Sequence, residues 1–304
     1  MHPQALFYLF GNEDWPVYAY GICMGVGIIA CFIFLMWAFW YRNFNEEASD
    51  KILVIGIFAT AFGIFMAMVF QSVYNYIDDL NEFGEATFTL AGSMTFYGGL
   101  IGGVSSFLIV WNLYVFVIAP RAKSKLLQNN MNASLSDALP IIPIGITIAH
   151  AFGRLGCFFG GCCYGAPTDS WIGLPCAHGY SEVLGMNMDG VNVIPVQLFE
   201  CIFLFLLSGI MALLYFKFKF NCNFGLYAVA YGIWRFIIEF FRVDNRGSFI
   251  SGVTPSQLWA IVMVILGIAY FFAYKYLFKR FMKHPELQPS LRKKGEEEAS
   301  TPAE

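Results

Sequence analysis

The sequence predicts an all-α integral membrane protein with seven transmembrane helices, its N-terminus outside and its C-terminus in the cytoplasm. Three observations lead to this prediction. Hydrophobic residues make up 58% of the 304 residues and charged residues only 13%, which is not the composition of a soluble domain. Long stretches contain no Asp, Glu, Lys or Arg, and a helix needs about 20 apolar residues to cross a bilayer. Most of the 18 Lys and Arg residues fall on one side of the resulting topology.

The uncharged stretches place the seven helices in order along one polytopic domain, residues 1–283. The expected helices are 17–40, 52–76, 96–118, 139–160, 196–216, 222–242 and 254–275. The fifth and sixth helices are predicted from shorter apolar stretches, each with a single charged residue near its end. The start of the chain lacks a basic n-region and a small-residue cleavage site, so we expect no removable signal peptide.

Two segments outside the helices complete the domain plan. Residues 161–195, between the fourth and fifth helices, are expected to form the only long external loop. The tail, residues 284–304, is polar, and its charges occur in blocks. That composition is typical of a disordered segment, and the topology places the tail in the cytoplasm.

The basic residues set the orientation through the positive-inside rule. The first, third and fifth connections and the tail hold Arg42, Lys51, Arg121, Lys123, Lys125, Lys217, Lys219, Lys275, Lys279, Arg280, Lys283, Arg292, Lys293 and Lys294. The opposite side holds only Arg242 and Arg246. The N-terminus is therefore expected outside. Arg154 and Arg235 are left within the helices themselves.

Polar residues within the helices gather toward the outer side. The expected topology puts Tyr20, Tyr97, Glu200, Arg154, Arg235, Glu239 and Arg242 in the outer half of the membrane. Arg235 and Glu239 are four residues apart and Arg242 follows one turn later, so the three should share one helix face. A structural salt bridge between helices would explain them, but charges at membrane depth usually mark a functional site. We therefore expect a site at the outer face.

Glycines indicate where helices pack closely. The run TFYGGLIGG places Gly98, Gly99, Gly102 and Gly103 on one expected helix. Small residues at this spacing allow another helix backbone to approach.

Four motifs, in this order, resemble the prolipoprotein diacylglyceryl transferase family. They are YGGLIGG, SDALPIIPIGITIAHAFGRLGCF, PVQLFE and YGIWRFIIEFFRVD. The resemblance implies an enzyme of the bacterial plasma (inner) membrane that moves the diacylglyceryl group of phosphatidylglycerol onto the lipobox cysteine of a preprolipoprotein, releasing glycerol 1-phosphate. It implies phosphatidylglycerol, the preprolipoprotein signal peptide and the lipid bilayer as partners, with no nucleic acid, no cofactor and no metal.

The resemblance also implies roles for individual residues. Arg154 and Arg235 would hold the phosphate, since a guanidinium offers a rigid donor fork. Glu239 would orient Arg235, and Glu200 would contact the lipid head group or the arriving peptide. Tyr20, Asp137, Gln197 and Arg242 complete the expected substrate-binding set.

The chain departs from the family pattern at three places. Tyr97 stands where the family usually has a histidine, residues 156–161 replace an asparagine-containing run, and residues 65–67 replace a Gly-Gly-Arg motif. His150 lies one helical turn before Arg154. We hypothesise that His150 takes over the role of base left by Tyr97; the alternative is a buried histidine bonded to a carbonyl group.

Cysteines leave a second class of function open. Cys157, Cys162, Cys163 and Cys176 fall near the external loop, and His178 follows. Their spacing matches no zinc pattern, and a disulfide, packed or free thiols, and a metal or redox site all remain possible. Two alternative functions are a related transferase with another acceptor and a non-catalytic thiol or metal transporter. A transporter would be expected to carry polar groups along its whole path through the membrane. The inner halves of these helices hold almost none, which favours an enzyme over a transporter.

Overall fold

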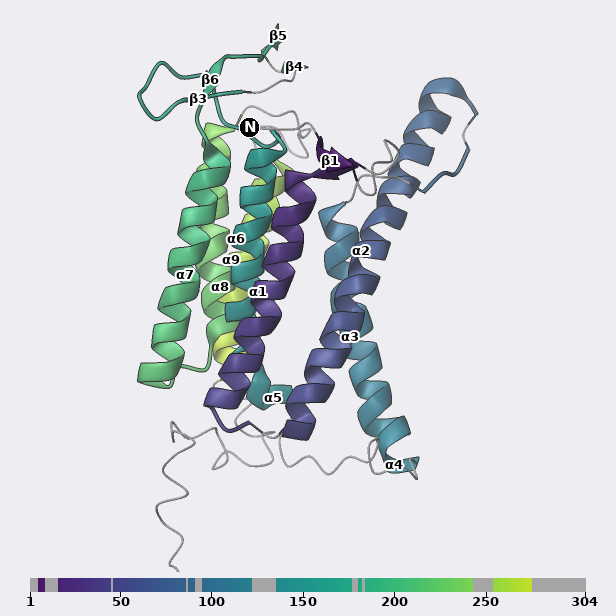
Figure 1. Cartoon of the computed structure of the whole chain (residues 1–304), viewed down its shortest axis with the longest axis vertical. Helices are drawn as coiled ribbons and strands as arrows, with labels where there is room; N and C mark the ends of the chain where they lie inside the picture. The colour runs from purple at the N-terminus through teal and green to yellow at the C-terminus, as the bar shows by residue number, and fades with distance from the viewer. Residues whose placement is uncertain are drawn as a thin grey trace, which may run out of the picture. The chain divides into compact units, whose positions relative to one another are not determined.

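The computed structural model describes residues 5–8, 16–44, 46–85, 87–90, 95–121, 135–176, 180–181, 184–242 and 254–274. The chain divides into two compact units (Figure 1). The first unit combines Met1–Arg42 with Leu135–Glu304, and the second is Asn43–Ser134. The predicted tail, residues 284–304, lies outside the described residues.

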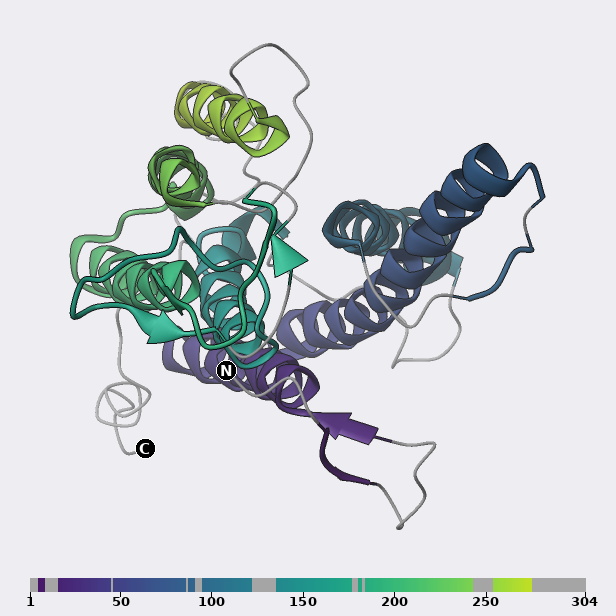
Figure 2. The same ribbon diagram turned by 90° about the horizontal axis from the view of Figure 1, so that it is seen from above.

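Five long helices build the first unit. They are α1 (Ala19–Tyr41), α6 (Ile142–Phe159), α7 (Val196–Phe218), α8 (Asn223–Ile238) and α9 (Pro255–Ala273). Seen end-on, α6 lies between α1 and α7, and α8 lies beside α9 (Figure 2). Small residues allow these approaches: a Cβ atom added at Gly27 of α1 would lie 2.7 Å from Cβ of Phe152 on α6. The short helix α5 (Leu135–Ala138) precedes α6, and the 3-10 turn η3 (Glu239–Phe241) follows α8.

Short strands lie at one end of this unit. β3 (Leu174–Pro175) pairs with β6 (Asn192–Val193), and β4 (Tyr180–Ser181) pairs with β5 (Met186–Asn187), both antiparallel. Before α1, β1 (Ala5–Tyr8) pairs with β2 (Pro16–Tyr18). The all-α prediction missed these strands because two to four residues are too few to show an alternating pattern. We call this end, where α6 and α8 finish and α1, α7 and α9 begin, the loop end.

The second unit is a helix pair. It consists of α2 (Glu46–Phe83), α3 (Phe96–Leu113), the π-helical turn η2 (Tyr114–Ile118) and α4 (Ala119–Arg121). The glycines of the TFYGGLIGG run face α2: Cβ atoms added at Gly98 and Gly102 would lie 2.6 and 2.4 Å from Cβ of Phe70 and Met66. The predicted close approach at this glycine run is confirmed. α2 extends beyond its expected bounds because the helix continues through charged residues at both ends.

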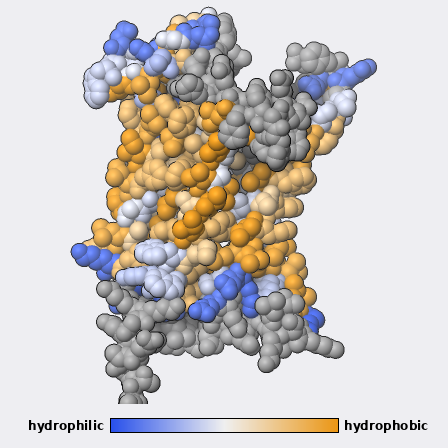
Figure 3. Space-filling view, in the orientation of Figure 1, coloured by the Kyte–Doolittle hydropathy of each residue, from blue (hydrophilic) through white to orange (hydrophobic). Residues whose placement is uncertain are grey.

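Seven helices in the described part of the chain are long and apolar enough to cross a membrane. All seven predicted helices are confirmed, with bounds within a few residues except for α2. Hydrophobic side chains cover the middle of the helices, and hydrophilic ones gather toward their ends (Figure 3). Such a surface suits a bilayer. The predicted orientation of the termini remains a prediction.

Candidate active site

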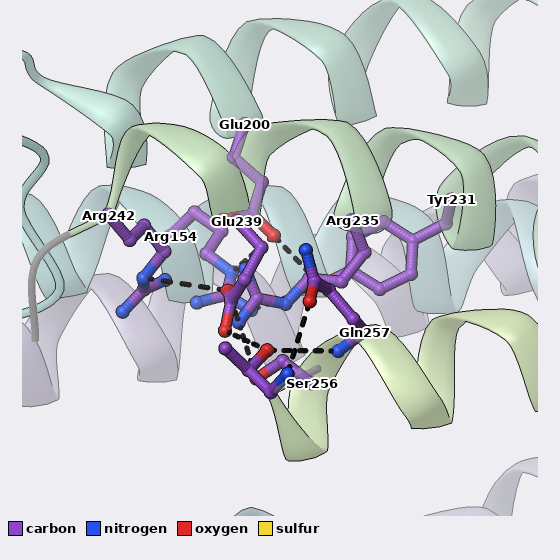
Figure 4. A network of polar contacts seen from close by, with 9 residues as sticks. Arg154, Glu200, Tyr231, Arg235, Glu239, Arg242, Ser256 and Gln257 are labelled. Carbon is purple, nitrogen blue, oxygen red and sulfur yellow. Dashed lines mark hydrogen bonds and ion pairs between the residues drawn. The ribbon is translucent and has the colours of Figure 1, made fainter. Parts of the chain in front are cut away.

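Polar side chains from four helices meet in the half of the first unit nearest the loop end. α6 supplies Arg154 in its last two turns, α7 supplies Glu200 in its first two turns, and α8 supplies Tyr231 and Arg235. Figure 4 shows these residues in one network with Glu239 and the start of α9. The sequence prediction that Arg154, Glu200, Arg235 and Glu239 gather toward one end of the helices is confirmed.

Arg154, Glu200 and Tyr231 form a closed triangle of contacts. Nε of Arg154 lies 3.1 Å from Oε1 of Glu200, and Nη2 of Arg154 donates to the Tyr231 hydroxyl at 3.1 Å. That hydroxyl in turn donates to Oε1 of Glu200 at 2.8 Å. The Glu200 side chain is 1% exposed and that of Arg154 is 18% exposed. A buried charge of this kind is stable only when it is paired and hydrogen-bonded, so each member holds the other two in place.

Arg235 is held separately, by its own helix and by the start of α9. Its Nη2 atom lies 2.8 Å from Oε2 of Glu239 and donates to Oγ of Ser256 at 3.0 Å. Thr254 donates through Oγ1 to the other Glu239 oxygen, Oε1, at 2.9 Å. Thr254 is also the N-cap of α9, where it forms a capping box with Gln257. The start of α9 therefore fixes both partners of the Arg235–Glu239 pair.

Arg242 lies just past the end of the helix. The chain tightens into a 3-10 turn at Glu239 and becomes extended at Arg242, and a backbone bridge links Arg242 to Gly165 of the loop. Nε of Arg242 lies 4.0 Å from Oε2 of Glu239. The expectation that Arg235, Glu239 and Arg242 share one helix face is right for the first two residues. It is wrong for Arg242, because the helix ends before that residue.

His150 lies on α6, one turn before Arg154, beside this network. Its Nδ1 atom is 2.9 Å from the Tyr227 hydroxyl, and its ring stands edge-on to that of Tyr231 at 4.7 Å. The partner is therefore a phenol and not the backbone carbonyl group considered in the alternative. The role of His150 as a base stays a prediction.

The remaining predicted site residues fall in several places. Gln197 is buried and donates through Nε2 to the carbonyl oxygen of Cys162 at 2.6 Å. Tyr20 packs against Gly156, where an added Cβ atom would lie 3.2 Å from the Tyr20 ring. Asp137 lies in α5 and Tyr97 in α3 of the second unit. The side chains of Asp137 and Tyr97 lie outside the described part of the structure.

Several buried polar atoms of the site have no hydrogen-bond partner among the described residues. Among them are Oε2 of Glu200, an acceptor, and Nη1 of Arg235, a donor. An unsatisfied buried polar group costs about 1–3 kcal/mol. A ligand or a water molecule that supplied a donor to Glu200 and an acceptor to Arg235 would recover this free energy.

Sequence reasoning missed the contributions of Tyr227 and Tyr231, and of Thr254 and Ser256 at the start of α9, to the site. Tyr227, Tyr231, Arg235 and Glu239 recur at intervals of four residues, which places them along one side of α8. This spacing could have identified the two tyrosines. The sequence Thr254-Pro255-Ser256-Gln257 also carries the capping-box pattern.

The cysteines near the loop end divide into two groups. The sulfur atoms of Cys157, Cys162 and Cys163 lie within 4.8 Å of one another. Cys176 is buried with Met188 and Val193 in an apolar cluster. No disulfide bond joins cysteines of the described residues, so the disulfide, one of the three possibilities, is absent among them. His178 lies outside the described residues.

Hydrogen bonds between the three thiols shift their proton affinities. Bonds from Cys157 and Cys162 lower the pKa of Cys163, and the positive charges of Arg242 and Arg154 act in the same direction. Bonds to Cys157 and Cys163, together with burial, raise the pKa of Cys162. The hydrogen bonds therefore favour loss of a proton from Cys163 over loss of one from Cys162.

Comparisons with known proteins agree on one family. The family model described as prolipoprotein diacylglyceryl transferase matches residues 6–273. The chain is 31% identical over 269 residues to the phosphatidylglycerol–prolipoprotein diacylglyceryl transferase of Clostridium tetani, covering 88% of this chain and 95% of the relative. It is 28% identical over 288 residues to the enzyme of that name from Finegoldia magna, covering 93% of this chain and 99% of the relative. The chain is also 29% identical over 256 residues to the second such transferase of Clostridium perfringens. This match covers 83% of this chain and 89% of the relative.

Proposed function

The chain belongs to the prolipoprotein diacylglyceryl transferase family, and we propose that it transfers the diacylglyceryl group of phosphatidylglycerol to the lipobox cysteine of preprolipoproteins. It is a transferase of lipoprotein biosynthesis, and the transporter alternative finds no support among the relatives. The observation that carries the assignment to this site is the pair of arginines, Arg154 and Arg235, placed by different partners in one buried network.

The reaction needs fixed positive charge. The sulfur of the acceptor cysteine forms a bond to a glyceryl carbon while the bond from that carbon to a phosphate oxygen breaks. The leaving glycerol phosphate therefore gains negative charge in the transition state. Donors that are already oriented toward this charge lower the barrier most, because they need no reorganisation during the reaction.

Arg235 suits this task because its contacts use only part of its guanidinium group. Nη2 is occupied by Glu239 and Ser256, whereas Nη1 has no partner among the described residues. We assign Nη1 to a phosphate oxygen of the donor lipid. Arg154, held on one side by Glu200 and Tyr231, supplies a second guanidinium group to the phosphate.

Glu200 is assigned to the head group through its second oxygen. Oε1 is used by Arg154 and Tyr231, and Oε2 is buried without a hydrogen-bond partner among the described residues. The terminal glycerol of phosphatidylglycerol carries hydroxyl groups that donate hydrogen bonds. Tyr20, Asp137, Gln197 and Arg242 remain our candidates for the rest of the substrate-binding set.

We assign the role of base for the acceptor thiol to His150. If Nδ1–H donates to the Tyr227 hydroxyl, Nε2 carries a lone pair and accepts a proton from the thiol. In the opposite tautomer Nδ1 accepts from the Tyr227 hydroxyl and Nε2 carries the proton, so neither nitrogen is free to accept a proton from the thiol. Tyr97 is a phenol with an ordinary pKa of about 10, so at neutral pH it donates a hydrogen bond more readily than it accepts a proton.

We place the site at the outer face of the bacterial plasma membrane, with the N-terminus outside and the tail in the cytoplasm. The distribution of Lys and Arg between the connections supports this orientation. Complementation tests the function: the chain should restore lipoprotein modification in a bacterium depleted of its own diacylglyceryl transferase. Modification of lipids or proteins without a lipobox cysteine would instead point to another acceptor.

A further inference from the structure

Three thiols meet beside the site, where the chain leaves α6. Cys157 lies in the last turn of α6, and Cys162 and Cys163 lie in the turn that follows. Each of the three sulfur atoms lies within 4.8 Å of the other two. The Cys162 side chain is exposed and the other two are half-buried, so the cluster is accessible from the loop end.

The backbone holds the three cysteines in this arrangement. The amide of Gly160 donates to the Gly156 carbonyl at 2.8 Å, and that of Cys162 donates to the Cys157 carbonyl at 3.2 Å. Gly161 and Cys163 both adopt positive φ angles, of 68° and 65°. This conformation is easy for glycine but costs about 1–2 kcal/mol for other residues. The turn brings Cys162 and Cys163 back toward Cys157.

A contact from α7 fixes the middle of the turn. Gln197 is buried and donates through Nε2 to the Cys162 carbonyl oxygen at 2.6 Å. The turn is therefore held by contacts to both α6 and α7. Such a preformed arrangement reduces the conformational entropy that a ligand must remove on binding.

The spacing of the sulfur atoms is close to that of a metal site. In a tetrahedral site with Zn–S distances of about 2.3 Å, the sulfur ligands lie roughly 3.8 Å apart. The largest separation here is no more than 4.8 Å, so small side-chain rotations would close the site. Thiolates prefer soft or borderline cations, and a water molecule would take the fourth position.

Nearby positive charge favours the thiolate ligands. Arg154 lies one turn before Cys157 on α6, and the backbone of Arg242 is bridged to Gly165, two residues after Cys163. Three thiolates and one divalent cation carry a net charge of −1, which these arginines offset. Hydrophobic packing, the usual role of a cysteine in a membrane protein, does not explain the exposed Cys162.

We propose that Cys157, Cys162 and Cys163 bind one thiophilic divalent cation, of which Zn²⁺ is the representative. A thiol must lose its proton to bind the cation as a thiolate, so binding releases protons. The proposal does not depend on the transferase assignment. Cys176, the fourth cysteine near the external loop, lies in its own apolar cluster and is not part of this site.

Metal binding by the purified full-length protein tests the proposal. The reduced protein in detergent, kept free of oxygen, is titrated with Zn²⁺ against a coloured chelator, and with Cd²⁺ to observe sulfur-to-metal charge-transfer absorption. We expect one equivalent of tightly bound metal and a charge-transfer band. Because loss of an outer-shell partner alone costs about 10–100-fold in affinity, Cys162→Ser and Cys163→Ser should each weaken binding by about 100-fold or more. The matched control Cys222→Ser, at the opposite end of α8 from the site, should bind as the wild type does.

Alkylation of the wild-type protein removes any dependence on how the variants fold. Bound Zn²⁺ should protect the peptide carrying Cys157, Cys162 and Cys163 from a thiol reagent and leave the reactivity of Cys222 unchanged. Absence of stoichiometric binding would overturn the proposal. So would Cd²⁺ binding without the charge-transfer band, or equal affinity in the wild type and the two variants.

Discussion

Nε of Arg154 and Oε1 of Glu200 lie 3.1 Å apart, joining α6 to α7 inside the helical bundle. The Tyr231 hydroxyl bridges the same two side chains from α8. Three helices are thus tied together at the place where the substrate phosphate is proposed to bind. Binding and stability are expected to depend on the same contacts.

Removing either partner of this pair should destabilise the protein strongly. Glu200→Gln leaves Arg154 as a buried charge without its counter-ion, and breaking a buried pair from one side costs about 3–5 kcal/mol. Arg154→Met should cost a similar amount. Thermal unfolding in detergent, monitored by tryptophan fluorescence, measures both effects.

The double variant Arg154→Met/Glu200→Gln separates pairing from packing. The double variant contains no uncompensated buried charge at this pair. We therefore expect its loss of stability to be smaller than the sum of the losses in the two single variants. Additive losses would show that the two side chains do not stabilise one another.

Arg235→Lys should abolish most activity without removing the charge. A lysine ammonium cannot contact Glu239 and Ser256 and still present a second donor to a phosphate. Loss of one oriented donor to a developing oxyanion typically lowers kcat by about 10²–10³, and we expect a loss of that size. Arg42→Lys is the matched control, since Arg42 is also buried and bonded to Tyr215 but lies at the opposite end of α1. Comparable activity of Arg235→Lys and the control would remove Arg235 from the chemistry.

The tyrosine that holds His150 provides a test of the base. His150→Ala should lose most activity, and Tyr227→Phe should lose part of it because the imidazole tautomer is no longer fixed. Tyr97→Phe should lose little, and Tyr97→His should partly rescue His150→Ala. Initial rates of transfer to a lipobox peptide by the purified variants measure these effects. An active His150→Ala enzyme would exclude this residue as the base.

Glycine substitutions test the packing of the second unit. Gly98→Ala places a methyl group 2.6 Å from Cβ of Phe70 and 2.8 Å from the Met66 carbonyl oxygen. Such a clash forces α2 and α3 apart, at a cost of about 1–3 kcal/mol. Gly209→Ala, on α7 with no atom within 4 Å of the added group, should leave the melting temperature unchanged or raise it slightly. Equal melting temperatures of the two variants would argue against the close α2–α3 contact.

The helical spans could be predicted because the membrane imposes a simple pattern. An uncharged stretch of about 20 residues is sufficient to identify a span, and the seven spans follow from composition alone. The depth of the charged residues also predicted that Arg154, Glu200 and Arg235 come together. The ends of α2 differ most from the prediction, since a helix continues into water wherever its residues favour helix formation. The sixth helix was expected to reach residue 242, but α8 ends at Ile238.

Contacts that depend on tertiary structure could not be predicted. Thr254 bonds to Glu239 and so positions Arg235, although Thr254 and Glu239 are 15 residues apart in the sequence. No pattern in the sequence around either residue indicates this contact. The grouping of Cys157 with Cys162 and Cys163 depends on a turn containing two positive φ angles, one of them at a cysteine. A cysteine in that conformation is uncommon, so the sequence favoured no particular pairing.

Diacylglyceryl transfer in a purified system tests the central claim most directly. Wild-type protein is mixed with phosphatidylglycerol and a lipobox peptide, and the mass of the peptide and the released glycerol phosphate are measured together. We expect the peptide to gain one diacylglyceryl group for each glycerol phosphate released, and Arg154→Ala to lose this activity while Arg42→Ala retains it. No transfer by the wild type, or equal transfer by Arg154→Ala and the wild type at matched amounts of folded protein, would contradict the account.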